Sequence, residues 1–158
     1  MVRFAEERDL PRVNEIRRQV NELHVNGRPD VFKPGFCPEM REHVYEMWRG
    51  EDSDVIVAER DGVICGMACV EYLDNQESPY CHARKIYYIT EFGVDEACQR
   101  QGIGRELMDF MRSDAKSRGF SSIELGMWTF NETAQKFYET LGFQTCRRFM
   151  EWNLTDKT

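Results

Sequence analysis

The sequence has no long apolar segment and no excess of basic residues. No stretch approaches the roughly 20 apolar residues that a helix needs to cross a bilayer, and residues 1–7 resemble neither a signal peptide nor a transit peptide. The formal net charge is −7 and is spread along the chain, whereas nucleic-acid binding requires clustered Lys and Arg. We therefore expect a cytoplasmic protein that spans no membrane and binds no nucleic acid.

The sequence also lacks the cysteine pairs of metal sites. Six cysteines are present without any CxxC pair, so no metal is predicted. A reducing cytoplasm disfavours disulfides. Cys65 and Cys69 stand four residues apart in a strand-like run, where alternation would place both on one face. We expect most thiols to be free and buried, because reduced cysteine behaves as a small apolar residue.

Nothing in the chain indicates a domain boundary. With 158 residues, of which 41% are hydrophobic, the chain is long enough for one core and short for two. It contains no Pro/Gly/Ser-rich linker and no repeat. We predict one domain over residues 1–155 and a short C-terminal tail over 156–158.

Periodicity and turn residues predict an α/β fold. Apolar residues at three- and four-residue steps indicate helices, and Asp61-Gly62 between two apolar runs is typical of a hairpin turn. The predicted elements are strand 2–5, a helix from about 10 to 26, helix 39–48, strands 54–60, 63–73 and 85–94, helix 102–117, strand 122–127, helix 132–141 and strand 143–154. This order, β-α-α-β-β-β-α-β-α-β, predicts a mixed, mostly antiparallel central sheet flanked by about four helices.

The segment most indicative of chemistry leads from an apolar strand ending at Val94 into a helix that opens with Gly102 and Gly104. The first turn of a helix has unpaired N–H groups and the positive end of the dipole, so it can bind a phosphate. Arg100 and Arg105 would add positive charge. The alternative is that both glycines serve only close packing.

Two common nucleotide motifs are absent. Leu107 stands where the third glycine of GxGxxG would be, and no GxxxxGK[ST] occurs. The glycine pair therefore indicates neither a dinucleotide fold nor a P-loop.

Three segments together resemble the GNAT superfamily of acetyltransferases. Gln99-Arg100-Gln101-Gly102-Ile103-Gly104 resembles its Q/R-x-x-G-x-G/A signature, and residues 131–143 resemble its N-x-x-A-x-x-F-Y-x-x-x-G-F segment. The opening Val2-Arg3-Phe4-Ala5 with Asp9-Leu10 is also typical. The motifs cover the C-terminal half, and the N-terminal half agrees only in the order of its elements.

The resemblance implies an N-acetyltransferase that uses acetyl-CoA and no metal. Backbone groups of the turn would hold the pyrophosphate, and the strand before it would expose backbone to the pantetheine. The residues implied in CoA binding are Phe92, Val94, Gln99, Arg100, Gln101, Gly102, Ile103, Gly104, Arg105 and Asn131. Asn131 is also a suitable helix N-cap.

Two residues are candidates for catalysis. Tyr138 stands where the family has a tyrosine that protonates the CoA sulfur, with a core aromatic as the alternative. Glu91 is the acidic residue within the strand before the turn, and we predict it as the general base, with solvent or another residue as the alternative. Strand parity predicts Tyr88 and Thr90 on the opposite face from Glu91.

The acceptor that we expect from the resemblance is a primary amine of a small molecule, a peptide or a protein terminus. His24, Arg28 and Tyr88, with Asp30 and Phe32, are candidates for contact with it, although Arg28 and Asp30 could instead form an ion pair within their own loop. A catalytically silent acyl-CoA-binding module and an antibiotic-modifying enzyme remain alternatives. A covalent route through Cys98 is less favoured, and the sequence leaves a homodimer open.

Overall fold

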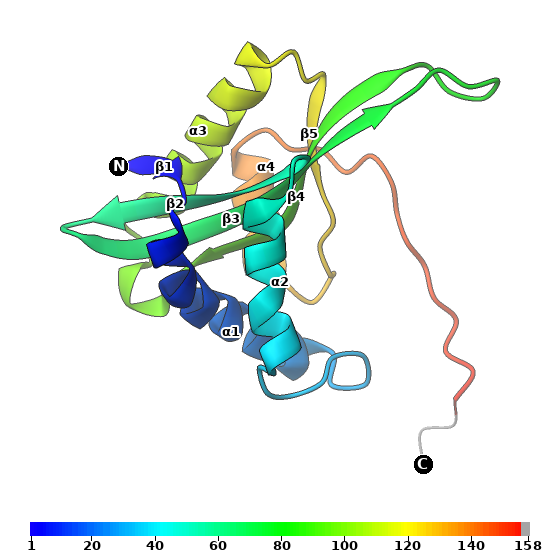
Figure 1. The fold of residues 1–158 in the computed structure, drawn as a ribbon. Helices are drawn as coiled ribbons and strands as arrows, with labels where there is room; N and C mark the ends of the chain where they lie inside the picture. The colour runs from blue at the N-terminus through cyan, green and yellow to red at the C-terminus, as the bar shows by residue number, and fades with distance from the viewer. Residues whose placement is uncertain (156–158) are drawn as a thin grey trace. The chain divides into compact units, whose positions relative to one another are not determined.

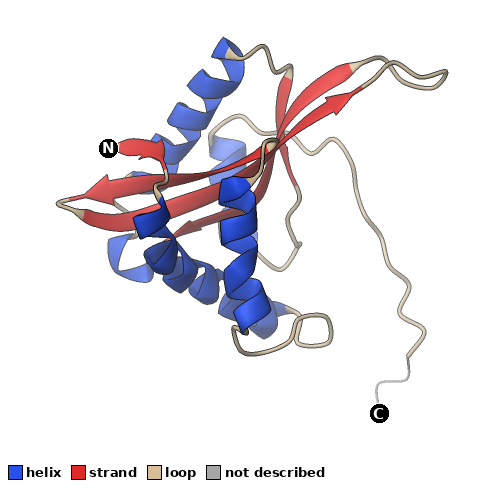
Figure 2. Cartoon of the chain, viewed as in Figure 1, coloured by secondary structure: helices blue, strands red, loops and turns tan. Residues whose placement is uncertain are grey.

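The computed structural model describes residues 1–155, so the predicted tail 156–158 lies outside the described residues. The elements are β1 (Val2–Phe4), α1 (Leu10–Gly27), α2 (Pro38–Arg49), β2 (Ser53–Arg60), β3 (Val63–Asn75), β4 (Arg84–Val94), α3 (Ile103–Ser117), β5 (Ser122–Leu125) and α4 (Glu132–Thr140), with short 3-10 helices η1 (Glu7–Asp9) and η2 (Glu96–Cys98) (Figures 1 and 2). The predicted mixed α/β fold is confirmed. The described residues fall into two compact units, Met1–Gly126 and the residues from Met127 on.

The first unit contains one five-stranded sheet in the order β1-β2-β3-β4-β5. The first three pairings are antiparallel and β4–β5 is parallel, as expected for a mostly antiparallel mixed sheet. The predicted turn between β2 and β3 is confirmed, because Asp61 and Gly62 both have positive φ, at 51° and 77°. Positive φ at both central residues matches the twist of a two-residue hairpin.

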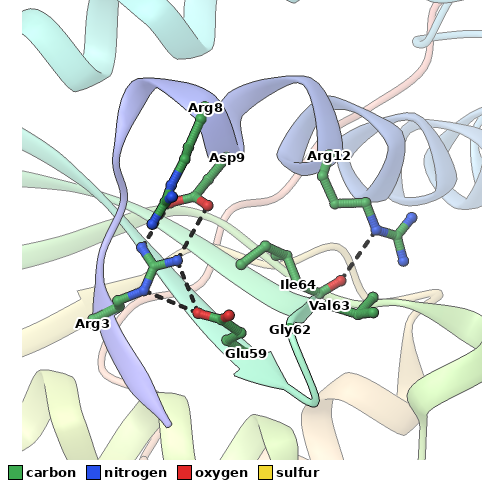
Figure 3. A pocket seen from close by; sticks show the side chains of 8 residues that line it. All are labelled: Arg3, Arg8, Asp9, Arg12, Glu59, Gly62, Val63 and Ile64. Atoms are coloured by element: carbon green, nitrogen blue, oxygen red, sulfur yellow. Dashed lines mark hydrogen bonds and ion pairs between the residues drawn. The ribbon is translucent and has the colours of Figure 1, made fainter.

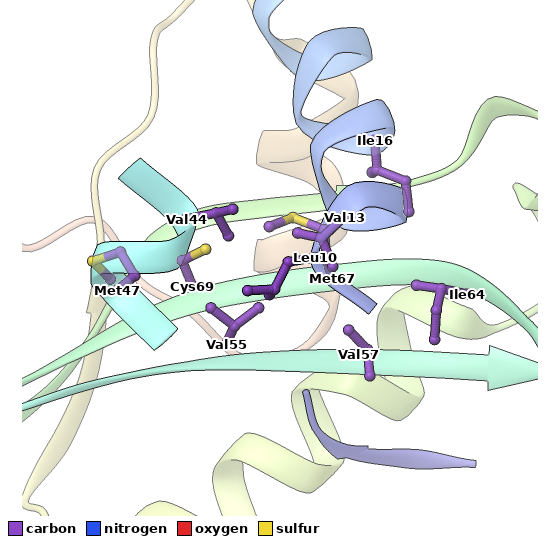
Figure 4. Close-up of a cluster of buried hydrophobic side chains, with 10 residues drawn as sticks. All are labelled: Leu10, Val13, Ile16, Val44, Met47, Val55, Val57, Ile64, Met67 and Cys69. Atoms are coloured by element: carbon purple, nitrogen blue, oxygen red, sulfur yellow. The ribbon is translucent and has the colours of Figure 1, made fainter. Parts of the chain in front are cut away.

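Helices cover both faces of this sheet. The helices α1 and α2 bury their apolar sides against β2 and β3 in one cluster (Figure 4). That cluster contains Leu10, Val13, Ile16, Val44, Met47, Val55, Val57, Ile64, Met67 and Cys69. On the other face α3 packs against β3 at Gly66, where an added Cβ would lie 2.8 Å from Ile103 Cγ2. The close approach of α3 therefore requires a glycine in β3.

Two β-bulges change which side chains share a face. The β3–β4 register pairs Cys69 with Glu91 but Val70 with Ile89, so Thr90 is an extra residue. Tyr88 pairs with Glu71. Glu71 and Cys69 are two residues apart on β3 and therefore share a face, so their partners Tyr88 and Glu91 also lie on one face of the sheet. The predicted opposite placement of Tyr88 was wrong, because one inserted residue reverses the alternation.

The second bulge separates two cysteines. The β2–β3 register pairs Ala58 with Gly66 and Glu59 with Ile64, so Cys65 is the extra residue. Cys69 lies in the core cluster, whereas Cys65 is not among the residues of that cluster and contacts Cys98. Burial is confirmed for Cys65 and Cys69, but three of the thiols are exposed: Cys37, Cys81 and Cys146.

The predicted last strand is absent from the described part of the chain. Residues 143–155 form no strand, and the large apolar side chains from Phe149 on are exposed, with Phe149 at 99% and Trp152 at 89%. The composition suits a strand, but a strand forms only where a neighbour supplies ladder hydrogen bonds, and no described strand pairs with this segment. Among the helices described, none combines the length and the apolar character needed to cross a membrane.

Candidate active site

The turn between β4 and α3 is fixed at its start by Asp95. Its N–H donates to Cys65 O at 2.8 Å, its Oδ1 accepts from the Ala97 N–H at 2.8 Å, and its carboxylate pairs with Arg12 of α1. Burial alone would raise the pKa of Asp95, but the hydrogen bonds from Ala97 and Arg12 outweigh it and hold the pKa below its ordinary value. The charged carboxylate thus ties the turn to β3 and α1.

The end of the turn presents backbone donors. Glu106 is the first residue of α3 whose N–H donates, to Gly102 O at 3.1 Å. Within residues 1–155, the backbone N–H groups from Gly102 to Arg105 have no protein acceptor. Arg100 and Gly102 have positive φ, at 65° and 78°. Left-handed residues before a helix gather N–H groups into a concave anion site.

This donor set fits the diphosphate of CoA. The four N–H groups lie at the N-terminus of a 15-residue helix, where the dipole favours negative charge. The side chains of Arg100 and Arg105 are exposed at the same turn. An added Cβ at position 102 would meet no atom within 4 Å, so space does not require a glycine here. The positive φ of this residue does.

In the described part of the chain, the strand before the turn has no neighbouring strand along the last part of one edge. Pairing of β4 with β5 ends at Ile89 and Leu125, while β4 continues to Val94. The positions of Phe92 and Val94 lie in this last part of β4. A strand edge without a neighbouring strand can hydrogen-bond an amide-containing chain, which is the chemistry of pantetheine.

Glu91 is held by a buried arginine of α1. Arg17 Nε lies 2.7 Å from Glu91 Oε2 and Arg17 Nη2 lies 3.0 Å from Oε1. The Arg17 side chain is 5% exposed and that of Glu91 is 31% exposed. Arg17 also donates to Asn14 Oδ1 and to Met40 O. One guanidinium therefore joins α1, α2 and the carboxylate of β4.

The second unit contains Asn131 and Tyr138. Asn131 Oδ1 accepts from the Ala134 N–H at 3.1 Å, which confirms its role as the N-cap of α4. Tyr138 packs edge-on against Phe137 and Phe143, with ring centroids 5.4 and 5.6 Å apart. Burial raises the pKa of Tyr138 to about 12, so its phenol keeps its proton at neutral pH.

The residues predicted to contact the acceptor are less clearly grouped. Arg28 pairs with Asp30 at 2.8 and 2.9 Å, so the ion pair within the loop is present. His24 Nδ1 lies 2.8 Å from Val20 O, and its ring packs on Phe32 at 5.1 Å. Tyr88 lies on β4, on the face that carries Glu91.

A pocket elsewhere in the first unit contains none of these residues. Its volume is about 420 Å³, and it is lined by Arg3, Arg8, Asp9, Arg12, Glu59, Gly62, Val63 and Ile64 (Figure 3). Its arginines have carboxylate partners: Arg3 pairs with Asp9 and Glu59, and Arg12 with Glu15. Paired charges leave little attraction for an added ion, so we do not place the acetyl-transfer chemistry here.

Sequence reasoning missed Arg17. It stands four residues after Val13 and one after Ile16, on the apolar stripe of α1. A charged residue at a buried helical position indicates a buried partner, so this signal was present. Its partner Glu91 is 74 residues away, and only the fold identifies it.

Comparison with known proteins gives a consistent result. Residues 18–143 match the Acetyltransferase (GNAT) family. The uncharacterized N-acetyltransferase YycN of Bacillus subtilis (strain 168) is 30% identical over 63 residues, and this alignment covers 40% of each chain. The chain thus aligns with less than half the length of that curated relative.

Solved structures extend the likeness over nearly the whole chain. A tetramutant of the BH1408 protein from Bacillus halodurans is 30% identical, covers 98% of this chain and 99% of its own, and superposes with a TM-score of 0.93. AAC(6')-Iy in complex with a bisubstrate analog, CoA-S-monomethyl-acetylneamine, shares the fold at 16% identity and a TM-score of 0.76, covering 99% of this chain and 98% of its own. No cluster of three or more potential metal ligands occurs among residues 1–155.

Proposed function

The chain belongs to the GNAT acetyltransferase family, and on that premise we propose that it transfers an acetyl group from acetyl-CoA to a primary amine. The amine attacks directly in a ternary complex, without a covalent acetyl-enzyme. The observation that carries this proposal is the set of N–H groups from Gly102 to Arg105, at the start of α3, which have no acceptor among the described residues 1–155. Such a set suits a diphosphate.

Acetyl-CoA supplies a thioester that an amine can attack. In the proposal, the turn Gln99–Arg105 binds the diphosphate through its backbone, and Arg100 and Arg105 add charge. The backbone at Phe92 and Val94 holds the pantetheine. Asn131 adds a contact while its Oδ1 caps α4. Most of these contacts are backbone contacts, so the conformation of the turn matters more than its side chains.

Proton transfers are assigned to two residues. Tyr138 donates a proton to the leaving sulfur, and its raised pKa of about 12 keeps the phenol protonated at neutral pH. Glu91 removes a proton from the amine, directly or through water. Arg17 holds the Glu91 carboxylate with two hydrogen bonds, which fixes the orientation of the base.

The acceptor is assigned only to the class of primary amines. Tyr88 shares the face of β4 with Glu91 and is the acceptor contact we favour, with His24 and Arg28 further away in sequence on the α1–α2 segment. Aminoglycoside acetyltransferases share the fold at 16–22% identity, which supports including aminoglycosides in an acceptor screen. It does not favour them over peptides.

A thiol-release assay tests the proposal. Purified protein and acetyl-CoA are incubated with polyamines, aminoglycosides and peptides with free N-termini, and released CoA thiol is followed. We expect release above the rate of spontaneous hydrolysis with at least one class, and mass spectrometry should find the acetylated amine. Binding of acetyl-CoA without release for any amine would instead favour a catalytically silent acyl-CoA-binding module.

A further inference from the structure

Two thiols meet beside the proposed CoA turn. Cys65 and Cys98 are 33 positions apart in the sequence, and their sulfur atoms lie 2.9 Å apart. Cys65 is the extra residue of the β3 bulge, and Cys98 ends η2, directly before Gln99. The Asp95 N–H donates to Cys65 O at 2.8 Å, so the two backbones are joined as well.

We propose that Cys65 and Cys98 form a reversible disulfide when the protein meets a peroxide, and that this crosslink weakens the binding of acetyl-CoA at the neighbouring turn. The effect on acetyl-CoA rests on the proposed function, whereas the disulfide itself does not. In reducing compartments, disulfides of this kind are transient and regulatory rather than structural.

The chemistry balances with hydrogen peroxide as the oxidant. The Cys98 sulfur, the more exposed of the two, attacks one peroxide oxygen; an S–O bond forms, the O–O bond breaks, and water leaves. The Cys65 sulfur then attacks the Cys98 sulfenic acid; the S–S bond forms, the S–O bond breaks, and a second water leaves with the Cys65 proton. Two thiols are oxidised by two electrons in total, and the peroxide is reduced by two.

The resting form is the dithiol. The hydrogen bond that Cys98 donates to Cys65, together with burial, raises the pKa of Cys98 to about 11. The Cys98 thiol is therefore largely protonated at neutral pH, which makes its oxidation slow. A small dithiol reductant would reverse the crosslink by exchange.

The position of each cysteine determines which part of the chain moves. A disulfide bond is about 2.05 Å long, so the two sulfurs must approach further than their present 2.9 Å. Cys65 is 5% exposed and lies between β2 and β4 in the sheet, whereas Cys98 lies in a single 3-10 turn. We therefore expect η2 and the turn that follows to move. A displacement of about 1 Å in a binding turn lowers its affinity for the ligand substantially.

The experiment uses a background that removes the exposed thiols, Cys37→Ser, Cys81→Ser and Cys146→Ser, and keeps the buried Cys69. The protein is treated with hydrogen peroxide, quenched with catalase and digested. We expect a peptide that links Cys65 and Cys98, an intact mass lower by two hydrogen atoms, and a Kd for acetyl-CoA raised at least about tenfold. Dithiothreitol should restore both the mass and the affinity.

Cys65→Ser in the same background is the matched control, because it keeps Cys98 oxidisable but removes its partner. It should give no linked peptide, and its mass should not fall. Absence of the linked peptide in the parent overturns the disulfide, and a linked peptide with unchanged affinity overturns its regulatory effect. Amide hydrogen exchange from Gln99 to Arg105 should change on oxidation even if the reduced protein fails to bind acetyl-CoA. That failure to bind would contradict the proposed function but not the disulfide.

Discussion

The two units of the molecule differ in how their backbone groups are satisfied. In Met1–Gly126 five strands pair in one sheet, with helices on both faces. From Met127 on, the described chain has one nine-residue helix, α4, and then residues 143–155 without a strand. The turn proposed to bind CoA lies wholly in the first unit and the proposed acid, Tyr138, in the second. Binding and proton transfer should therefore be separable by mutation.

Tyr138→Phe tests the second unit with the largest expected effect on turnover. Removing the phenol oxygen should lower kcat by about 10²–10⁴-fold, while the Kd for acetyl-CoA is unchanged, because the turn is in the other unit. Thiol release and calorimetry measure the two quantities. Tyr80→Phe, at an exposed tyrosine of the β3–β4 loop, is the control and should change neither.

The pH profile sharpens the same test. Because the raised pKa of Tyr138 is about 12, its proton is retained below that pH, and kcat should not fall from loss of this proton up to about pH 10. If Tyr138→Phe leaves kcat unchanged, the residue only packs against Phe137 and Phe143.

Glu91→Gln tests whether the first unit also contributes to chemistry. As the general base, Glu91 should contribute about 10²-fold to kcat/KM, so the folded variant should lose about this factor in thiol release. If Glu91 only pairs with Arg17, the melting temperature falls while kcat/KM of the folded variant is unchanged. The two outcomes assign the carboxylate either to catalysis or to packing.

Gly66→Ala disturbs the packing of α3 against β3 at Ile103 and Leu107. The new Cβ would lie 2.8 Å from Ile103 Cγ2 and 3.0 Å from Leu107 Cδ1, so the free energy of unfolding should fall by about 1–3 kcal/mol. Urea denaturation measures it. Gly126→Ala, where the nearest atom is 3.6 Å away, should be close to neutral. Equal losses in both variants would contradict the close contact between β3 and α3.

Arg28→Ala carries the smallest expected effect. Its ion pair with Asp30 is partly exposed, so the free energy of unfolding should change by less than about 1 kcal/mol. If Arg28 only forms the ion pair with Asp30 within its loop, KM for the acceptor stays the same in the variant. A raised KM with unchanged stability would assign Arg28 to acceptor binding.

Local patterns in the sequence were sufficient for most elements. The stripe of α1, the Asp61-Gly62 turn and the glycines that open α3 each act over a few residues, so periodicity and turn chemistry predicted them. The two bulges could not be predicted in this way, because the extra residues at Cys65 and Thr90 are defined by the register of neighbouring strands.

Contacts between distant segments were likewise beyond the sequence. The Arg17–Glu91 pair and the Cys65–Cys98 contact join residues 74 and 33 positions apart. The strand predicted over 143–154 had a suitable composition, but its formation depends on a partner strand, which composition does not report.

The central claim is that the start of α3 binds acetyl-CoA, and isothermal titration tests it most directly. Wild-type protein is compared with Gly102→Val/Gly104→Val and with Gly119→Val, since Gly119 has the same φ of +78° as Gly102 but lies at the other end of α3. We predict micromolar binding to the wild type and to Gly119→Val, and a Kd at least about tenfold higher for the folded turn variant. No binding to the wild type, or equal affinity in all three proteins, would contradict the account.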